Sequence, residues 1–272
     1  ADVAPALLIG EGAYGKVAMS AASKRDFEIG REIVARLAPF DVGQAVVVAN
    51  GAVLAIEGAE GTDAMLKRIV ERQDSARGGV LVKWPKPGQE LRVDMPAIGP
   101  NTVAGVVAAG LRGIAVQAGA TLAAQRGDTS DAADAAQVFI AGLEAGAASG
   151  VTKTVLQDDG EIGLAVLGAL VPRVRSRGVV VVRRHVLAVE AGEGLGDLVA
   201  RAAGRRQWGK SKKRRGALAV ASLADLDRDV ITAAGDAGYE WIVASAADGA
   251  AGLRDDIRSV GMKVRIGGTE AG

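Results

Sequence analysis

Five charged side chains that could bind a phosphate-bearing ligand gather in one proline-rich stretch, residues 83–100. Three are cations and two are carboxylates: Lys83, Lys86, Arg92, Glu90 and Asp94. Four of the seven prolines of the chain lie here, and each fixes its own φ and pushes the preceding residue away from helix. We therefore predict a shaped, extended loop. Its mixture of charges suits an anionic ligand, with or without a divalent metal.

Asp94 is the candidate for a reacting carboxylate in this loop. It precedes Met95-Pro96, so its backbone is held extended and its carboxylate can be aimed at a metal or at a water. The alternative is an aspartate that only ends a strand. Lys83, Lys86 and Arg92 could neutralise two phosphates and the charge that develops on a leaving group. Their alternative is that of exposed loop cations without a role.

A second group of polar residues, Glu60 to Asp63, precedes a predicted helix. Glu60 and Asp63 could hold Mg²⁺ or Mn²⁺ together with Asp94, because these ions take oxygen ligands. Alternatively, Thr62 or Asp63 only caps the helix. The candidates for contacts with substrate are Gln44, Thr62 and Gln89.

The composition excludes several kinds of chemistry. The chain of 272 residues contains no cysteine, which excludes disulfides, iron–sulfur clusters, thiolate zinc sites and cysteine nucleophiles. A single histidine, His185, argues against a histidine-rich metal site or a Ser-His-Asp triad. The net charge of +1 makes long-range steering weak. No apolar run approaches the roughly 20 residues that span a bilayer, so we expect a soluble, cytoplasmic protein.

Residues 9–17, Ile-Gly-Glu-Gly-Ala-Tyr-Gly-Lys-Val, match the glycine-rich loop of protein kinases. No Val-Ala-Ile-Lys follows them, and His185 stands in Arg-His-Val rather than in a catalytic His-Arg-Asp. Short glycine motifs arise readily by chance, so we do not interpret the protein as a kinase.

The hydrophobic pattern predicts an α/β fold. The strongest local signal is Asn50-Gly51 between two apolar runs, which is typical of a β-hairpin. The predicted helices cover residues 24–38, about 62–72 and 103–109, and the predicted strands cover 45–49, 52–56, 79–82 and 113–116.

The sequence also indicates an internal repeat. At a constant offset of 133, Val46-Val-Val48 aligns with Val179-Val-Val181, and Val53 to Glu57 aligns with Val186 to Glu190. Further on, Val80–Val82 aligns with Leu218–Val220. We therefore predict two tandem related layered α/β units, each with a mixed sheet that contains a β-hairpin and has flanking helices. Their predicted bounds are residues 1–142, the catalytic type, and 143–272, a degenerate copy with a structural or partner-binding role.

The second copy differs from the first in its polar residues. About ten residues of the proline-rich loop are absent, and Leu195-Gly196 replaces Thr62-Asp63. Its hairpin turn is predicted at Arg184-His185. Glu57 has a counterpart in Glu190, which favours a structural role for both glutamates. We infer that function belongs to the first copy.

The second copy has a basic run of its own, Arg205 to Arg215, with Trp208 inside it. Such a run could bind acidic lipid headgroups or nucleic acid, and nucleic acid is the less favoured of the two. The alternative is a solvated loop. Membrane binding would place the protein peripherally on the inner membrane.

Residues 5–142 resemble the C-terminal domain of the LpxI-type UDP-2,3-diacylglucosamine pyrophosphatases of lipid A biosynthesis. The matching segments include Glu60-Gly-Thr-Asp-Ala-Met65, Lys86-Pro-Gly-Gln-Glu90 and Arg92-Val-Asp-Met-Pro96. The resemblance implies Mg²⁺-dependent hydrolysis of an acylated UDP-sugar to UMP and a sugar 1-phosphate, with Asp94 as the key aspartate. Family members usually begin with a separate N-terminal domain, which is absent from this sequence. A partner subunit or a second copy of the chain would then complete the site; alternatively, the protein is a non-catalytic relative that binds a nucleotide sugar or a partner.

Overall fold

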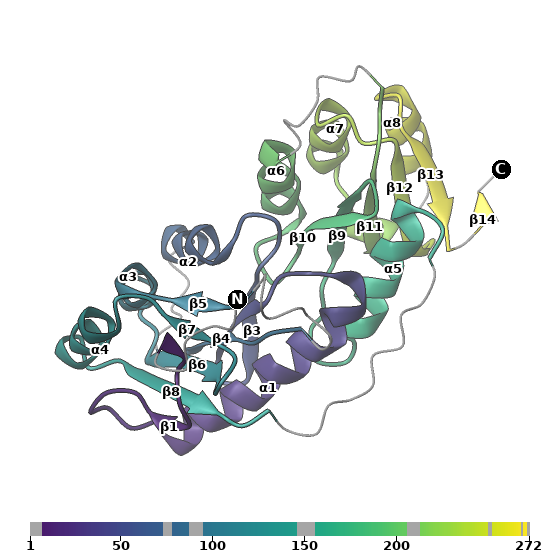
Figure 1. Ribbon diagram of the computed structural model, residues 1–272. Helices are drawn as coiled ribbons and strands as arrows, with labels where there is room; N and C mark the ends of the chain where they lie inside the picture. The colour runs from purple at the N-terminus through teal and green to yellow at the C-terminus, as the bar shows by residue number, and fades with distance from the viewer. Residues whose placement is uncertain are drawn as a thin grey trace. The chain divides into compact units, whose positions relative to one another are not determined.

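A computed structural model describes residues 7–72, 78–86, 95–145, 156–205, 213–249, 252–267 and 269–270. The chain divides into two compact units (Figure 1). The first unit contains residues 1–38 and 43–152, and the second contains 39–42 and 153–272. Each unit combines helices with a mixed sheet, as the sequence predicted.

The first unit is built on a six-stranded mixed sheet in the order β1-β8-β6-β4-β2-β3. Strands β4, β6 and β8 run parallel, and β2 and β3 form the predicted antiparallel hairpin. A separate parallel pair, β5 with β7, lies in the connections that follow β4 and β6. The bounds are β1 Gly12–Ala13, β2 Ala45–Ala49, β3 Ala52–Ile56, β4 Val80–Lys83, β5 Ala97–Ile98, β6 Gly113–Gln117, β7 Leu122–Ala123 and β8 Phe139–Leu143.

Helices cover both faces of this sheet. One face carries α1 (Ala21–Leu37), which approaches so closely that a Cβ added to Gly30 would lie 2.6 Å from Val82. The opposite face carries α2 (Thr62–Glu71), α3 (Pro100–Ala108) and α4 (Arg126–Ala135). Their apolar residues form one core cluster with those of the strands. Successive strand residues point to opposite faces, so Val82 faces α1 whereas Leu81 and Lys83 face α2.

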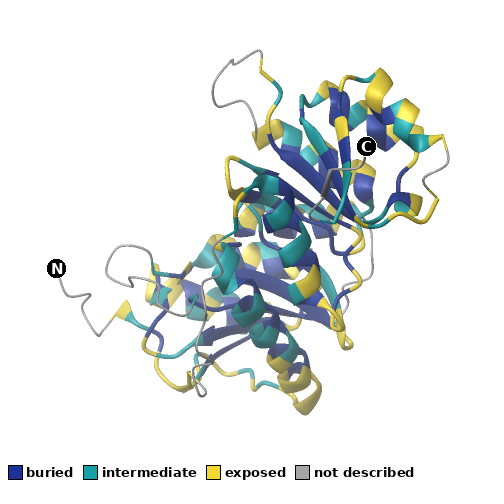
Figure 2. Cartoon of the chain, turned by 90° about the vertical axis from the view of Figure 1, so that its right-hand side faces the viewer, coloured by how far each residue is buried: buried dark blue, intermediate teal, exposed yellow. Residues whose placement is uncertain are grey.

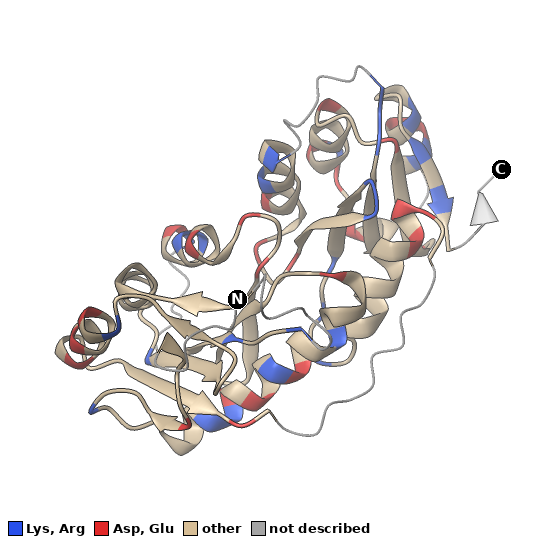
Figure 3. Cartoon of the chain, viewed as in Figure 1, with Lys and Arg blue, Asp and Glu red and all other residues tan. Residues whose placement is uncertain are grey.

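The strands of the first unit are buried and almost free of charge. Figure 2 shows the central strands in the colour of buried residues, and Figure 3 shows hardly any charge on them. Lys83, the last residue of β4, is the only charged residue in the described strands of this unit. A charge at the end of a buried strand is costly unless it is compensated, so this position marks the site.

The second unit has a six-stranded sheet in the order β10-β9-β11-β12-β13-β14. Helix α5 covers one face, and α6, α7 and α8 contribute to an apolar cluster on the other. The bounds are α5 Asp159–Leu170, β9 Gly178–Val182, β10 His185–Val189, α6 Leu195–Arg205, β11 Ala217–Ser222, α7 Arg228–Asp236, β12 Trp241–Ala246, α8 Leu253–Ser259, β13 Lys263–Ile266 and β14 Thr269–Glu270.

The two sheets share strand order and strand directions. When β3-β2-β4-β6-β8-β1 is set beside β10-β9-β11-β12-β13-β14, every neighbouring pair matches as parallel or antiparallel. An offset of 133 converts each Cα pair of the first hairpin into a pair of the second, including the irregularity between Val47 and Val48. The chain order also agrees for five of the six strands, but the edge strand β1 precedes the others in the first unit, whereas β14 follows them in the second. A common origin of the two units stays a prediction from the sequence.

Two details of the predicted repeat are wrong by one residue. Ala45 pairs with Lys83, and its counterpart Gly178 pairs with Val220, so Lys83 corresponds to Val220; the sequence alignment placed Val82 there. The second hairpin turn is Arg183-Arg184, not Arg184-His185, because both arginines have the positive φ that Asn50 and Gly51 have in the first unit. The first shift matters because it identifies Val220 as the residue that replaces Lys83 of β4.

Predicted elements of the first unit are confirmed, but their helix caps differ. Helix α2 is preceded by Gly61, with no side-chain cap, so neither Thr62 nor Asp63 caps it. Helix α3 begins at Pro100 after Gly99, whose N–H donates to Thr102 Oγ1. The glycine-rich segment forms the short edge strand β1, which pairs with β8. Strand β8 extends to Leu143, one residue past the predicted domain boundary.

Candidate functional site

The candidate site begins at the C-terminal end of β4, where the chain leaves the sheet. In α/β sheets, ligands bind outside the carboxyl ends of the parallel strands. The alternation of β4 directs Lys83 towards α2 and the next residue, Trp84, towards α1. The chain then enters residues 87–94, which lie outside the described residues, and reappears at Met95. The described residues therefore define the two ends of the proline-rich loop.

Three buried polar side chains form a hydrogen-bonded chain beside α2. The Lys83 ammonium donates to Thr62 Oγ1 at 3.0 Å, and the Thr62 hydroxyl donates to Glu57 Oε1 at 2.7 Å. Exposed fractions are 8% for Lys83, 8% for Thr62 and 7% for Glu57. Thr62 does not cap α2; its hydroxyl links a buried cation to a buried carboxylate, and its predicted contact with substrate stays a prediction. We call these residues the Glu57–Thr62–Lys83 cluster.

Burial and nearby charge act in opposite directions on Lys83. Burial lowers the pKa of its ammonium below the ordinary value of 10.5, because the charged form loses water. The negative charges of Glu57 and Asp63 offset part of this effect. Asp63 is exposed beside Thr62 at the start of α2. Burial thus disfavours the charged form of Lys83, and the two nearby carboxylates favour it.

Backbone contacts fix the first end of the loop. The Gln44 N–H donates to Glu57 Oε2 at 2.7 Å, and the Gln44 carbonyl accepts from the Trp84 N–H at 2.9 Å. Trp84 is buried against Phe27 of α1, with ring centroids 5.3 Å apart. Lys83 therefore bonds to Thr62 on one face of the sheet, and the residue after it, Trp84, packs on Phe27 on the other face.

The second end of the loop is fixed by the parallel pair β5 and β7. The Leu122 N–H donates to the Pro96 carbonyl at 2.8 Å, and the Ala124 N–H donates to the Ile98 carbonyl at 2.8 Å. The connection after β4 is thereby tied to the connection after β6. Residues 87–94 therefore start at the six-stranded sheet and finish at the separate β5–β7 pair, so the loop that carries Asp94 has both of its ends at defined positions.

The structure brings together only part of the predicted site. Lys83 and Thr62 are in contact, Asp63 is adjacent, and Gln44 contributes through its backbone. Lys86 is partly buried two residues after Trp84. The remaining predicted residues lie outside the described part of the chain: Gln89, Glu90, Arg92 and Asp94. The sequence favoured a structural role for Glu57, because Glu190 stands at the same position of the second copy. The signal that could have indicated a functional role is that Thr62 and Lys83, its partners, are replaced by apolar residues in the second copy.

Those partners are apolar in the second unit. Leu195 stands at the position of Thr62 and Val220 at that of Lys83, and both belong to the apolar core of that unit. Glu190 keeps the contact of its counterpart, accepting from the Arg177 N–H at 2.8 Å. Its other oxygen accepts from the N–H groups of Gly192 and Gly194. At this position, Glu190 bonds to the backbone of the following loop in the second unit, whereas Glu57 bonds to the Thr62 hydroxyl, which accepts from Lys83, in the first.

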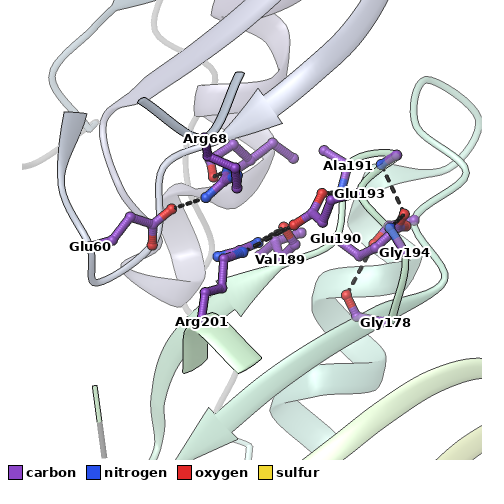
Figure 4. Close-up of polar contacts among 12 residues, drawn as sticks. Glu60, Arg68, Gly178, Val189, Glu190, Ala191, Glu193, Gly194 and Arg201 are labelled. Carbon is purple, nitrogen blue, oxygen red and sulfur yellow. Dashed lines mark hydrogen bonds and ion pairs between the residues drawn. The ribbon is translucent and has the colours of Figure 1, made fainter. Parts of the chain in front are cut away.

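Glu60 is engaged in an ion pair. Figure 4 shows its carboxylate with Arg68, whose guanidinium also donates to the Ile56 carbonyl at 3.3 Å. The second unit repeats this arrangement with Glu193, Arg201 and the Val189 carbonyl. Both glutamates are almost fully buried, and the second unit lacks the polar cluster. Recurrence in both units favours a structural role for Glu60 over its predicted role as a metal ligand.

The described residues do not assemble a metal site. Among them, no three histidine or acidic side chains gather closely enough to hold an ion. Of the predicted ligands, Glu60 is paired with Arg68 and Asp63 is exposed, while Asp94 lies outside the described residues. A site for Mg²⁺ stays a prediction that depends on Asp94.

Replacing Glu60 with glutamine is expected to lower the free energy of unfolding by about 3 kcal/mol, because it leaves the partly buried Arg68 without its counter-charge. Glu193→Gln, which removes the equivalent charge beside Arg201, is the matched control and should cost a similar amount. Urea denaturation with and without Mg²⁺ measures both. A loss in Glu60→Gln that appears only when Mg²⁺ is present would instead identify Glu60 as a metal ligand.

The predicted basic patch falls mostly on residues 206–212, outside the described residues. One member beyond them, Arg214, donates to the carbonyls of Gly235, Tyr239 and Val260. These bonds give Arg214 a structural role at the ends of α7 and α8. A test of membrane binding should therefore neutralise Lys212, Lys213 and Arg215 and keep Arg214. None of the helices in the described ranges has the length and apolarity that crossing a bilayer requires.

Comparison with known proteins supports the resemblance. Residues 10–141 match the family described as the LpxI C-terminal domain. Over 149 residues, the chain is 38% identical to the UDP-2,3-diacylglucosamine pyrophosphatase LpxI of Caulobacter vibrioides. This alignment covers 53% of the chain and 53% of the relative. The chain thus spans about half the length of the curated relative that it matches, and the matched region contains the Glu57–Thr62–Lys83 cluster and both ends of the proline-rich loop.

Proposed function

We propose that the first unit hydrolyses the pyrophosphate of UDP-2,3-diacylglucosamine, giving UMP and 2,3-diacylglucosamine 1-phosphate for lipid A biosynthesis. The observation that carries the proposal is the Glu57–Thr62–Lys83 cluster: a buried cation at the end of a parallel strand, beside an anchored loop, within the region that matches the LpxI C-terminal domain. The relative named for this activity is 38% identical over 149 residues of the chain.

The chemistry assigned to each residue follows from its type. Lys83 would donate hydrogen bonds to a phosphate oxygen and stabilise charge that develops as the anhydride breaks. Lys86 and Arg92 would contribute further positive charge from the loop. Asp94 would orient the attacking water, or hold Mg²⁺ or Mn²⁺ if the reaction requires an ion. Within the Glu57–Thr62–Lys83 cluster, Lys83 is the member that would donate to the phosphate.

UMP release from UDP-2,3-diacylglucosamine tests the proposal. We expect the purified chain to release UMP with Mg²⁺, and to do so more slowly after chelation or with Asp94→Ala. Mixing the chain with a separately expressed N-terminal domain of an LpxI relative tests whether a partner completes the site. Absence of turnover under all these conditions would retire the hydrolase proposal.

The alternative is a relative that binds a nucleotide sugar without hydrolysing it. Calorimetric titration with UDP-2,3-diacylglucosamine distinguishes the alternatives: binding without UMP release supports the alternative, whereas binding with metal-dependent release supports the hydrolase.

A further inference from the structure

We propose that Glu57 is a positioning residue: through Thr62 it holds the Lys83 ammonium at the end of β4 so that its remaining N–H donors can bind a phosphate oxygen of the substrate. This inference deepens the proposed function and rests on it for the identity of the ligand. The contact between the three side chains does not depend on the proposed function and can be tested without turnover.

The direction of the hydrogen bonds in the cluster is fixed by the chemistry of its members. An ionised carboxylate only accepts hydrogen bonds, and an ammonium group only donates them. Thr62 has one hydroxyl proton, and at 2.7 Å that proton is donated to Glu57 Oε1. The hydroxyl lone pairs then remain to accept from Lys83 at 3.0 Å. Glu57 therefore determines how the hydroxyl is turned, and the hydroxyl determines where the ammonium lies.

Lys83 retains donors for a ligand. Its ammonium has three N–H bonds, and within the described part of the chain one of them is donated, to Thr62. The residue is only 8% exposed, and a buried donor without a partner is costly. The two N–H bonds of Lys83 that have no acceptor among the described residues lie at the start of the loop that carries the other predicted phosphate-binding cations. An anionic oxygen placed there would satisfy them.

The second unit shows that the fold needs the glutamate but not the cluster. Among the described residues, Glu190 accepts hydrogen bonds from backbone N–H groups and forms an ion pair with the Arg177 guanidinium, which lies 3.7 Å away. In the first unit, the Oε1 atom that would accept from loop amides accepts from Thr62 instead. The matched residues Leu195 and Val220 have neither a hydroxyl nor an ammonium group. Both glutamates thus accept the same backbone bond, and Glu57 also accepts from a side-chain hydroxyl in the unit that contains the loop.

Glu57→Gln tests this assignment because the side chain keeps its shape. If the amide oxygen accepts from the Gln44 N–H, the amide NH₂ faces Thr62 and donates to it. The hydroxyl proton must then turn away from residue 57 and towards Lys83, which displaces the ammonium. Glu190→Gln is the matched control, since it alters the equivalent glutamate where no lysine is present. Thr62→Val removes the hydroxyl at constant shape, and Thr62→Ser restores it.

The first measurement follows the Lys83 ammonium itself. In protein labelled at lysine carbon ε, NMR titration reports the lysine signals, and Lys83→Met identifies the one from residue 83. We expect the signal of Lys83 and its titration midpoint to change in Glu57→Gln and Thr62→Val, and to stay as in the wild type in Thr62→Ser and Glu190→Gln. An unchanged Lys83 signal in Glu57→Gln would overturn the assignment.

The second measurement follows ligand binding, with inorganic pyrophosphate and UMP as probes. We expect Glu57→Gln and Thr62→Val to weaken binding of pyrophosphate at least tenfold, and Glu190→Gln to leave it unchanged. Equal weakening in both glutamine variants would reveal a general loss of stability and overturn the assignment. If the NMR signal changes as expected but wild-type protein neither binds these probes nor releases UMP, the positioning contact stands and the proposed function fails.

Discussion

Replacing Lys83 with methionine is expected to lower UMP release by about 10²-fold to 10³-fold, the cost of removing one preorganised donor from an oxyanion site. Methionine keeps most of the length and apolar volume of the side chain but cannot donate to a phosphate oxygen. Its neighbours Thr62 and Glu57 retain their mutual hydrogen bond. Initial rates at saturating substrate measure the effect.

Lys67→Met is the control for this variant, because Lys67 is exposed on α2 and pairs with Glu71 at 3.6 Å. It removes one lysine from the same unit without touching the cluster. We expect it to keep the activity of the wild type. Similar rates for Lys83→Met and the wild type would mean that Lys83 does not act on the substrate.

The pH dependence of stability gives Lys83→Met a second readout. The pKa of Lys83 is lowered in the folded chain by burial, so between that pKa and 10.5 the unfolded chain binds more protons than the folded chain. Stability of the wild type therefore gains a contribution that grows as pH rises through this window. Lys83→Met lacks it. Urea denaturation at increasing pH should show the difference, and parallel curves for the two proteins would contradict it.

Replacing Trp84 with alanine is expected to lower the free energy of unfolding by about 3–5 kcal/mol, the usual cost of deleting a large buried aromatic side chain. Trp84 is 7% exposed and packs on Phe27. The variant would also remove the packing on Phe27 that holds residue 84 in place between Lys83 and the loop. We therefore expect activity to fall even at temperatures where the protein is still folded.

Trp84→Phe is the matched variant, because it keeps a ring against Phe27 and the backbone bond to Gln44. We expect it to recover most of the stability and activity that Trp84→Ala loses. A further control is Trp241→Ala in the second unit, where the indole is only partly buried and lies under Lys263 and Arg265. If Trp84→Ala costs no more than Trp241→Ala, Trp84 does not anchor the loop.

The fold of the first unit was predictable because its signals are local. Asn50-Gly51 between two apolar runs specified the hairpin, and the structure gives both residues positive φ. The apolar stripe before Pro39 specified α1, which ends at Leu37. Strands that are buried on both faces read as continuous apolar runs, so β2 and β4 were also visible.

The contact between Glu57, Thr62 and Lys83 was not predictable, because Lys83 is 21 residues from Thr62 in the sequence and its position depends on the register of β4. In the sequence, Val80 to Val82 matches two neighbouring segments of the second unit about equally well, since all are small apolar residues. The pairing of Ala45 with Lys83, and of Gly178 with Val220, decides between them. Because the sequence alignment was shifted by one residue, it did not show that Val220 replaces Lys83.

The helix caps were missed for a related reason. Thr62 and Asp63 are both suitable capping residues by type, but Gly61 stands at the cap position of α2 in the structure. The hydroxyl of Thr62 is used inside the protein instead, for a cation that enters from a neighbouring strand. Local propensity cannot anticipate such a partner.

The shared registers of the two sheets have a consequence for how the chain folds. A strand of one unit could pair in register with the hairpin of the other, and misassembly between similar units is a characteristic failure of repeat proteins. With β4 in the second sheet, Lys83 would lie beside Gly178 and face Leu195, which has no hydroxyl. With β11 in the first, Val220 would leave Glu57 without a cation. We therefore expect the buried lysine to make the exchanged pairing costly.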